Sequence, residues 1–270
     1  MPELPEVETT VRALRGPLIG SVITDVRNDW PRHIVTPDLP ELQARIHGLQ
    51  IQAIHRRGKY LLFALSGGET LIIHLKMSGH LAVVKPDAPA SPYVHTTFGL
   101  ADGRELRFRD TRKFGRVYLV ADPEEIVGKL GPEPLTPEFT VAVLAERLAG
   151  RQRALKPLLL DQTLIAGIGN IYADEALFYA GLAPRRTAVS LSSSDIINLH
   201  AAIQKVLNLG IAREGASINT YVKPDGARGD MQNAVAVFRR TGEPCYECQT
   251  PIQRIVLSGR STHFCPHCQR

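Results

Sequence analysis

The residue types with the most chemical potential lie at the two ends of the chain. At the start, Pro2 follows Met1 and precedes Glu3. Cells remove an initiator methionine that precedes a small residue, so we expect Pro2 to become the N-terminus. Its secondary amine could then attack a carbonyl-like carbon to form an iminium, and Glu3 could donate or accept a proton beside it. The alternative is that these residues only begin a helix, with prolines before it and carboxylates in its first turn.

At the far end, Cys245-x2-Cys248 is followed, after sixteen residues, by Cys265-x2-Cys268. This spacing is typical of a four-cysteine zinc site, because each Cys-x2-Cys turn supplies two of the four tetrahedral ligands. Two disulfides are the alternative, and they would suit a secreted protein. Four thiolates leave no open position on the metal, so we expect one structural Zn2+ per chain without a catalytic role.

Composition and charge narrow the class of protein. The chain has 270 residues, of which 44% are hydrophobic, and this suits one large or two medium folded domains. No apolar run is long enough to span a membrane and no secretory signal is present, so we expect an intracellular protein without a membrane partner. The net charge is +5, and basic residues concentrate at 104–116, at Arg151, Arg153 and Lys156, and from Arg239 onward. Such clusters fit an enzyme that acts on a nucleic acid, although each could also be an ordinary solvated surface.

The elements that must position these residues change in character along the chain. Residues 5–15 have helical spacing, and Gly16-Pro17 ends that helix. Short β-type runs separated by turn residues then predict an antiparallel sandwich or barrel. The predicted strands are 51–54, 60–65, 70–75, 80–84, 96–100, 105–108 and 116–120.

The segment Gly131-Pro132-Glu133-Pro134 is predicted as a domain boundary, after which the pattern is mainly helical. The predicted helices are 136–148, 155–161, 170–180 and 192–213, followed by a loop over 215–232 and β character at 235–238 and 252–257. The predicted class is therefore α+β. The predicted domains are a β-sandwich over 1–130, a helical domain over 131–240 and a zinc finger over 241–270.

Six motifs occur in an order that is specific as a set. They are Pro2-Glu3-Leu4-Pro5-Glu6, Gly58-Lys59-Tyr60, His74-Leu75-Lys76-Met77-Ser78-Gly79, Asp110-Thr111-Arg112-Lys113-Phe114-Gly115, Gly169-Asn170-Ile171-Tyr172 and the four cysteines. With these motifs the chain resembles the formamidopyrimidine-DNA glycosylases, bifunctional repair enzymes for oxidised purines. The resemblance covers the whole chain. It implies an N-terminal antiparallel β-sandwich with an N-terminal helix, a helical domain with a helix-two-turn-helix motif, and a zinc-finger β-hairpin.

The resemblance implies a catalytic set made up of Pro2, Glu3, Lys59 and Arg260. Pro2 is similar to the nucleophile that attacks the sugar C1′ of the damaged nucleotide, and Glu3 to the proton shuttle that helps to open the sugar ring. Lys59 and Arg260 resemble residues that grip phosphates around the lesion. Glu6 resembles a supporting carboxylate, and its alternative role is to stabilise the first turn of the helix.

Six further residues are expected to bind DNA. A base that is flipped out of the stack leaves a hole, and Met77, Arg112 and Phe114 resemble the side chains that fill it and meet the orphaned partner base. The alternative places Met77 and Phe114 in the core, but the neighbouring glycines favour surface turns. Asn170 is predicted to cap a helix whose free N–H groups suit a phosphate oxygen. The remaining predicted contacts are His74 and Arg153.

The expected function is therefore removal of oxidised purines from duplex DNA, followed by cleavage of the abasic site, by a monomer in the bacterial cytoplasm acting on the nucleoid. A pyrimidine-directed glycosylase of the endonuclease VIII type and a non-catalytic zinc-containing DNA-binding protein remain as alternatives. The chain departs from the family pattern at Phe238, where tyrosine is usual. The segment 217–232 resembles a lid over the flipped base, but its sequence supports no assignment of single residues.

Overall fold

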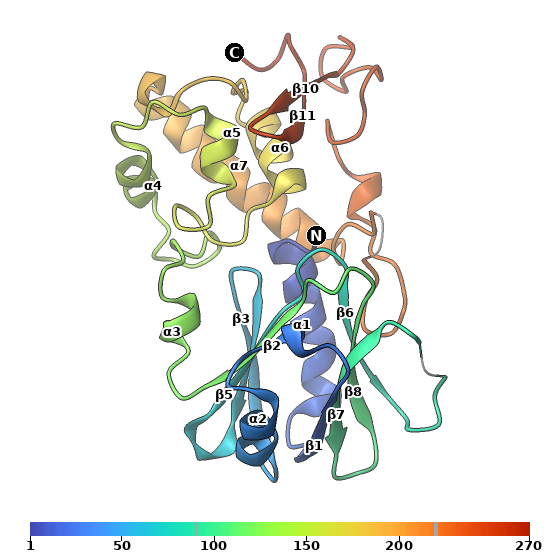
Figure 1. The fold of residues 1–270 in the computed structure, drawn as a ribbon. Coiled ribbons are helices and arrows are strands. Elements are labelled where there is room, and N and C mark those ends of the chain that lie inside the picture. The colour runs from blue at the N-terminus through green and yellow to red at the C-terminus, as the bar shows by residue number, and fades with distance from the viewer. Residues whose placement is uncertain (90, 219–220) are drawn as a thin grey trace. The chain divides into compact units, whose positions relative to one another are not determined.

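The computed structural model describes residues 1–89, 91–218 and 221–270 (Figure 1). Its contacts group the chain into two compact units. The first unit consists of Met1–Lys129 together with Glu214–Asp230, and the second of Leu130–Arg213 together with Met231–Arg270. Within the described ranges no helix is long and apolar enough to cross a membrane.

The domain limits at 130 and 240 stay predictions, and the structure adds one feature to them. Residues 214–230, which the sequence analysis placed in the helical segment, group with the N-terminal unit. The chain therefore leaves the second unit after Arg213 and returns to it at Met231.

The first unit is a β-sandwich, as the sequence predicts. One sheet has the strand order β1 (Ile23–Asn28), β7 (Val94–Leu100), β8 (Glu105–Asp110) and β6 (Gly79–Val84). The other has the order β2 (Ile34–Thr36), β9 (Arg116–Val120), β5 (Thr70–His74), β4 (Tyr60–Leu65) and β3 (Ile51–Arg57). The short β2 lies parallel to β9, and the other strand pairs described in the two sheets are antiparallel.

Helix α1 (Leu4–Leu18) supplies much of the core of this unit and holds the start of the chain in place. It packs against β3 and β4 of one sheet and β6 of the other (Figure 1). Its fully buried apolar residues recur every three or four positions, the period of one helix face. They are Leu4, Val7, Val11, Leu14 and Leu18. The helix runs past the predicted end at residue 15, since Pro17 in the last turn removes only one hydrogen bond.

Two smaller helices complete the first unit, α2 (Leu39–Ile46) and α3 (Glu124–Val127). The sequence analysis did not identify α2. Its start signal is nevertheless present, because the Asp38 side chain accepts a hydrogen bond from Glu41 N at 3.0 Å. Only Leu42 and Ile46 of this helix are buried, so its apolar repeat is too short to stand out from the surrounding strands.

The second unit contains the four predicted helices and the hairpin, but the first helix begins at Val141 and not at residue 136, because Thr140 caps it. The helices are α4 (Val141–Leu148), α5 (Leu155–Leu159), α6 (Asn170–Tyr179) and α7 (Ser193–Ala212). Helices α6 and α7 approach closely at Gly210, where an added Cβ would lie 2.5 Å from the Tyr172 ring. The hairpin strands are β10 (Gln253–Leu257) and β11 (Arg260–Phe264). They are joined by Ser258 and Gly259, both in the left-handed region that tight hairpin turns require.

The predicted strand at 235–238 is absent, and Glu175 explains why. This carboxylate lies on α6 and is fully buried. It accepts hydrogen bonds from the backbone N–H groups of Ala236, Val237 and Phe238 at 2.6, 3.0 and 2.9 Å. Three consecutive N–H groups that point at one side chain cannot alternate along a strand ladder. The apolar run instead wraps the carboxylate and packs its side chains into a small core.

Candidate active site

The amine at the start of the chain is that of Met1, which is partly buried in the first unit although the residue as a whole is 44% exposed. Burial lowers the pKa of this amine, and the positive charges of Lys59 and Arg112 lower it further, whereas Glu3 and Glu6 act in the opposite direction. Pro2 and Glu3 themselves are buried. A lowered pKa increases the fraction of neutral amine near pH 7, which is the form that attacks carbon. The environment therefore suits a nucleophilic amine with a carboxyl group beside it.

Glu6 has the structural role that the sequence offered as its alternative, at the first turn of α1. Its carboxylate accepts a hydrogen bond from Glu3 N at 2.8 Å and so satisfies an N–H group at the start of α1. The other oxygen accepts from Ala216 N at 2.7 Å, in the segment that returns to this unit. Gly215 has a φ of 82°, and an added Cβ there would lie 2.9 Å from Glu6 Cγ. The Tyr221 hydroxyl also donates to Glu6 O, at 3.3 Å.

This contact between segment 214–218 and Glu6 was not predicted. The glycine at position 215 is the sequence signal for it, because a left-handed residue beside a buried carboxylate needs the missing side chain. Residues 219 and 220, in the segment that resembles a lid, lie outside the described residues.

Lys59 and His74 lie at the ends of neighbouring strands, as predicted. Lys59 is 5% exposed and follows Gly58 in the turn between β3 and β4. His74 ends β5 and is 7% exposed. Burial lowers the pKa of His74 to about 3, and the charges of Lys76 and Lys59 add to this effect. His74 is therefore neutral at pH 7. Because its Nδ1 accepts from Lys76 N at 2.9 Å, its Nε2 carries the proton and can donate.

The three residues predicted to fill the void lie on two loops of the first unit. Phe114 is 45% exposed, which excludes the core position that was its alternative. Arg112 is exposed as well, and its guanidinium lies 4.9 Å from the centre of the Phe114 ring. Met77 is half-buried on the other loop. An exposed aromatic ring with a cation over it has the form of a side chain that can stack on bases.

In the second unit, Asn170 is not the helix cap that the sequence predicts. The cap residue is Gly169, and Asn170 is the first residue of α6. The Asn170 amide instead donates to Ser261 O at 3.2 Å, in strand β11 of the hairpin. Arg260 is exposed at the start of that strand, and Arg153 is exposed with Asp161 at 3.8 Å. The hairpin and the start of α6 thus bring Asn170 and Arg260 into one region.

A buried ion pair that the sequence analysis missed supports this region. The cluster at 151–156 was expected to be basic surface, but Lys156 and Asp174 are both fully buried, with Lys156 Nζ 2.7 Å from Asp174 Oδ1. Lys156 Nζ also donates to Ser261 O at 2.6 Å. Asp174 accepts from His263 N at 3.0 Å. The pair therefore joins α5, α6 and β11. A lysine within the apolar run at 155–160 is the sequence signal for its burial.

The four cysteines fit one structural Zn2+. Their sulfur atoms all lie within 4.8 Å of one another, with 3.9 Å between Cys245 and Cys268 and 3.4 Å between Cys248 and Cys265. Tetrahedral zinc with bonds of about 2.3 Å places its sulfurs about 3.8 Å apart. A disulfide would hold two sulfurs about 2.0 Å apart, so the alternative of two disulfides does not describe this cluster. The metal would hold the two Cys-x2-Cys turns together beneath the hairpin.

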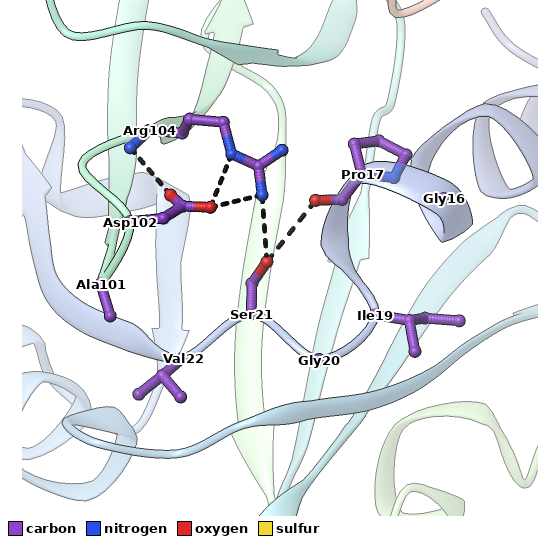
Figure 2. A pocket seen from close by; sticks show the side chains of 9 residues that line it. All are labelled: Gly16, Pro17, Ile19, Gly20, Ser21, Val22, Ala101, Asp102 and Arg104. Carbon is purple, nitrogen blue, oxygen red and sulfur yellow. Dashed lines mark hydrogen bonds and ion pairs between the residues drawn. The ribbon is translucent and has the colours of Figure 1, made fainter.

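A pocket of about 430 Å³ lies elsewhere in the first unit, at the C-terminal end of α1 (Figure 2). Its charged side chains, Arg104 and Asp102, pair with each other at 2.6 Å. Arg104 also donates to Ser21 Oγ at 3.3 Å. These bonds join the turn after β7 to the end of the helix. The charges are thus satisfied within the pocket wall, and none of the residues that line the pocket is a predicted site residue.

Comparison with known proteins identifies the family. Residues 1–117 match the family model described as formamidopyrimidine-DNA glycosylase N-terminal domain, residues 130–222 the formamidopyrimidine-DNA glycosylase H2TH domain, and residues 242–270 the zinc finger found in FPG and IleRS. The formamidopyrimidine-DNA glycosylase of Chloroflexus aggregans is 51% identical over 272 residues, covering 100% of this chain and 98% of that protein. The chain belongs to the formamidopyrimidine-DNA glycosylase family.

Solved structures agree with this assignment. The Lactococcus lactis Fpg in complex with DNA containing an abasic site has a TM-score of 0.93 at 40% identity, with 99% of each chain covered. MutM in complex with DNA containing carbocyclic 8-oxo-G has a TM-score of 0.92 at 39% identity, with 100% of each chain covered. The resemblance to this family, the α+β fold and the zinc finger that the sequence predicts are thereby confirmed.

Proposed function

We propose that this protein removes oxidised purines from duplex DNA and then cleaves the resulting abasic site. The observation that carries the proposal is the start of the chain, where Pro2 and Glu3 are buried and where burial and the charges of Lys59 and Arg112 lower the pKa of the Met1 amine against the opposite effect of Glu3 and Glu6. The complexes of the Lactococcus lactis Fpg with abasic-site DNA and of MutM with DNA containing carbocyclic 8-oxo-G support the choice of substrate.

In the proposed reaction, the Pro2 nitrogen becomes nucleophilic once Met1 has been removed. It forms a bond to the sugar C1′ while the bond from C1′ to the damaged base breaks, and the base leaves with the electron pair. Glu3 protonates the ring oxygen as the sugar opens, which gives an iminium between Pro2 and C1′. The iminium withdraws electrons and acidifies the neighbouring C–H group. Successive β- and δ-elimination then break the bonds from the sugar to the two phosphates, and hydrolysis of the iminium by water frees Pro2.

Other residues are proposed to hold the DNA while this occurs. Lys59 and Arg260 supply positive charge to the phosphates that flank the lesion, and Arg153 adds charge from the second unit. His74 and Asn170 act differently, because both are neutral. His74 can donate one hydrogen bond from Nε2, and the N–H groups at the start of α6 can meet a phosphate oxygen beside Asn170.

Met77, Arg112 and Phe114 are proposed to fill the space that the flipped base leaves. Phe114 would wedge between base pairs, and the paired donors of Arg112 would meet the edge of the orphaned base. We further infer that the protein works as a monomer in the bacterial cytoplasm, where its substrate would be the duplex DNA of the nucleoid.

Borohydride trapping tests the proposal directly. Borohydride reduces an iminium to a stable amine, so an oligonucleotide carrying one 8-oxoguanine should become covalently joined to the protein, and peptide mapping should place the adduct on Pro2. A form that retains Met1 should show no trapping. Glu3→Gln keeps the amine and the shape of the site, so it should lose base excision steeply while retaining more cleavage of a pre-formed abasic site.

The same experiment separates the alternatives. An adduct on Lys59 with unmodified Pro2 would overturn the assignment of the nucleophile. Trapping on oxidised pyrimidines in preference to 8-oxoguanine would favour the endonuclease VIII type. DNA binding without any trapping, in protein whose intact mass shows that Met1 is absent, would leave only the non-catalytic DNA-binding protein.

A further inference from the structure

A polar cluster lies beneath the two loops that carry Met77, Arg112 and Phe114, and the proposed chemistry does not use it. We define the first loop as residues 75–78 and the second loop as residues 111–115. The cluster consists of three side chains that are each at most 4% exposed. They are His33, Ser78 and Asp110.

The Asp110 carboxylate collects hydrogen bonds from both loops. The Ser78 hydroxyl of the first loop donates to Oδ1. From the second loop, Gly115 N donates to Oδ2 at 2.7 Å and Arg112 N to Oδ1 at 3.2 Å. Burial alone would raise the pKa of Asp110, but the bonds from His33, Ser78 and these N–H groups lower it well below its usual range. The carboxylate is therefore charged at neutral pH and accepts from both loops at once.

Ser78 is the direct link between the loops. While its hydroxyl donates to Asp110, its oxygen accepts from Arg112 N at 3.0 Å. Each loop also contains a residue in the left-handed region that lacks the freedom of glycine: Lys76 with a φ of 52° and Lys113 with a φ of 59°. Such conformations persist only where the surroundings hold them. The hydrogen bonds to Ser78 and Asp110 supply that constraint next to Met77 and Phe114.

The ends of both loops also pack against the ring of Phe108. The His33 ring stacks on Phe108 with 4.9 Å between ring centres, and His33 Nε2 lies 3.5 Å from Asp110 Oδ2. An added Cβ on Gly79 would lie 2.7 Å from the Phe108 ring, and one on Gly115 would lie 2.4 Å from it. The chain at the ends of both loops is thus packed directly against the same ring. Movement of one loop disturbs the support of the other.

We propose that Ser78 and Asp110 are positioning residues that lock the two loops into one rigid wedge, so that Met77 and Phe114 enter the duplex together. This inference rests on the proposed function, because it assigns a device to the void-filling step. Separate loops would each lose conformational freedom on entering the base stack, and that loss would slow the opening of the duplex. A wedge that is ordered beforehand avoids it.

The test compares wild type with Ser78→Ala and Phe114→Ala on a duplex carrying 8-oxoguanine and a neighbouring 2-aminopurine, whose fluorescence rises when the base is unstacked. Ser78→Ala should slow this rise about tenfold, the size expected for losing one hydrogen bond to a charged acceptor. Borohydride trapping on a single-stranded abasic oligonucleotide needs no unstacking and should stay within about twofold of wild type.

Ser21→Ala is the matched control, because this serine belongs to the same unit and accepts from Arg104 in the pocket of Figure 2. It should leave both readouts unchanged. Asp110→Asn provides a second variant of nearly equal size, which places an N–H group where an acceptor is needed. It should slow unstacking at least as much as Ser78→Ala does.

The double variant Ser78→Ala with Phe114→Ala decides whether Ser78 acts through the wedge. Unstacking should be no slower than with Phe114→Ala alone, since a lock has no effect once the wedge is gone. Multiplied losses, equal losses in unstacking and trapping, or no slowing with Ser78→Ala would each overturn the inference. Unstacking is observed before any bond breaks, so a wild type that unstacks without trapping would refute the proposed function alone.

Discussion

The two regions that carry the candidate residues are held together by different means. The loops of the first unit stand on a sandwich whose core includes 23 buried apolar side chains among the described residues, whereas the core around the hairpin of the second unit includes six, two of them cysteines. Apolar burial therefore suffices to support the loops, and their polar cluster serves to orient them. The hairpin has too little apolar area to fold on this basis and depends on zinc and a buried ion pair.

Buried polar groups therefore have two different roles in this molecule. In the first unit the core would persist without Ser78, and the group determines where exposed side chains point. Around the hairpin of the second unit, the Lys156–Asp174 pair and the cysteines add to a small apolar core. Removing a buried polar group around the hairpin should then lower stability, whereas removing one beneath the loops should change the orientation of exposed side chains.

Loss of zinc should produce the largest effect. Cys248→Ser removes one of the four thiolates, and structural zinc contributes about 10 kcal/mol to the folding of such modules. We expect the hairpin to unfold, zinc content to fall from one ion per chain, and DNA binding to be lost. Atomic absorption and a binding titration measure these changes. His267→Ala, at an exposed position in the same segment, is the control and should retain the metal.

Breaking the buried ion pair should have the next largest effect. Lys156→Met leaves the Asp174 charge buried without its cation, which typically costs about 3–5 kcal/mol. Denaturant unfolding should show this loss, and DNA binding should weaken because Ser261 and the hairpin lose their support. Arg185→Met replaces an exposed cation of the same unit and should change stability by less than about 0.5 kcal/mol. Similar values for the two variants would contradict the role assigned to the pair.

The smallest effect on stability should come from His74 and should depend on pH. The folded pKa of His74 is about 3, and that of an unfolded histidine is about 6.5. As the pH falls below about 6.5, His74 becomes protonated in the unfolded chain but stays neutral in the folded chain. Stability therefore decreases between about pH 6.5 and pH 3. The expected loss from this group at pH 5 is about 2 kcal/mol. His74→Gln should lack this part of the pH dependence, whereas His55→Gln, at an exposed position, should retain it.

Regular patterns allowed the sequence to predict most elements that position the site. The apolar repeat of α1, the alternating strands and the cysteine spacing each reflect a single local rule, and the structure confirms all three. The failures arise where a distant residue decides the outcome. The run at 235–238 has the apolar character of a strand, but Glu175 binds its N–H groups from about sixty residues away.

The same reason explains the misplaced lysine and asparagine. The apolar run around Lys156 suggests burial, but its partner Asp174 lies eighteen positions further along and is not marked by any local pattern. Asn170 stands at a helix start in both the prediction and the structure, but its amide is used by Ser261, which only the folded hairpin brings near. The link from Ser78 to Asp110 likewise connects two loops that three strands separate in the sequence.

The path of the chain has a consequence for how such proteins can be recombined. Glu6 accepts a hydrogen bond from Ala216 N, so the environment of the proposed nucleophile includes a segment encoded far downstream of the sandwich. A gene cut once near codon 130 would separate Glu6 from this partner. Exchange of the N-terminal half between homologues must therefore carry residues 214–230 with it, and these two distant stretches are expected to evolve as one inherited unit.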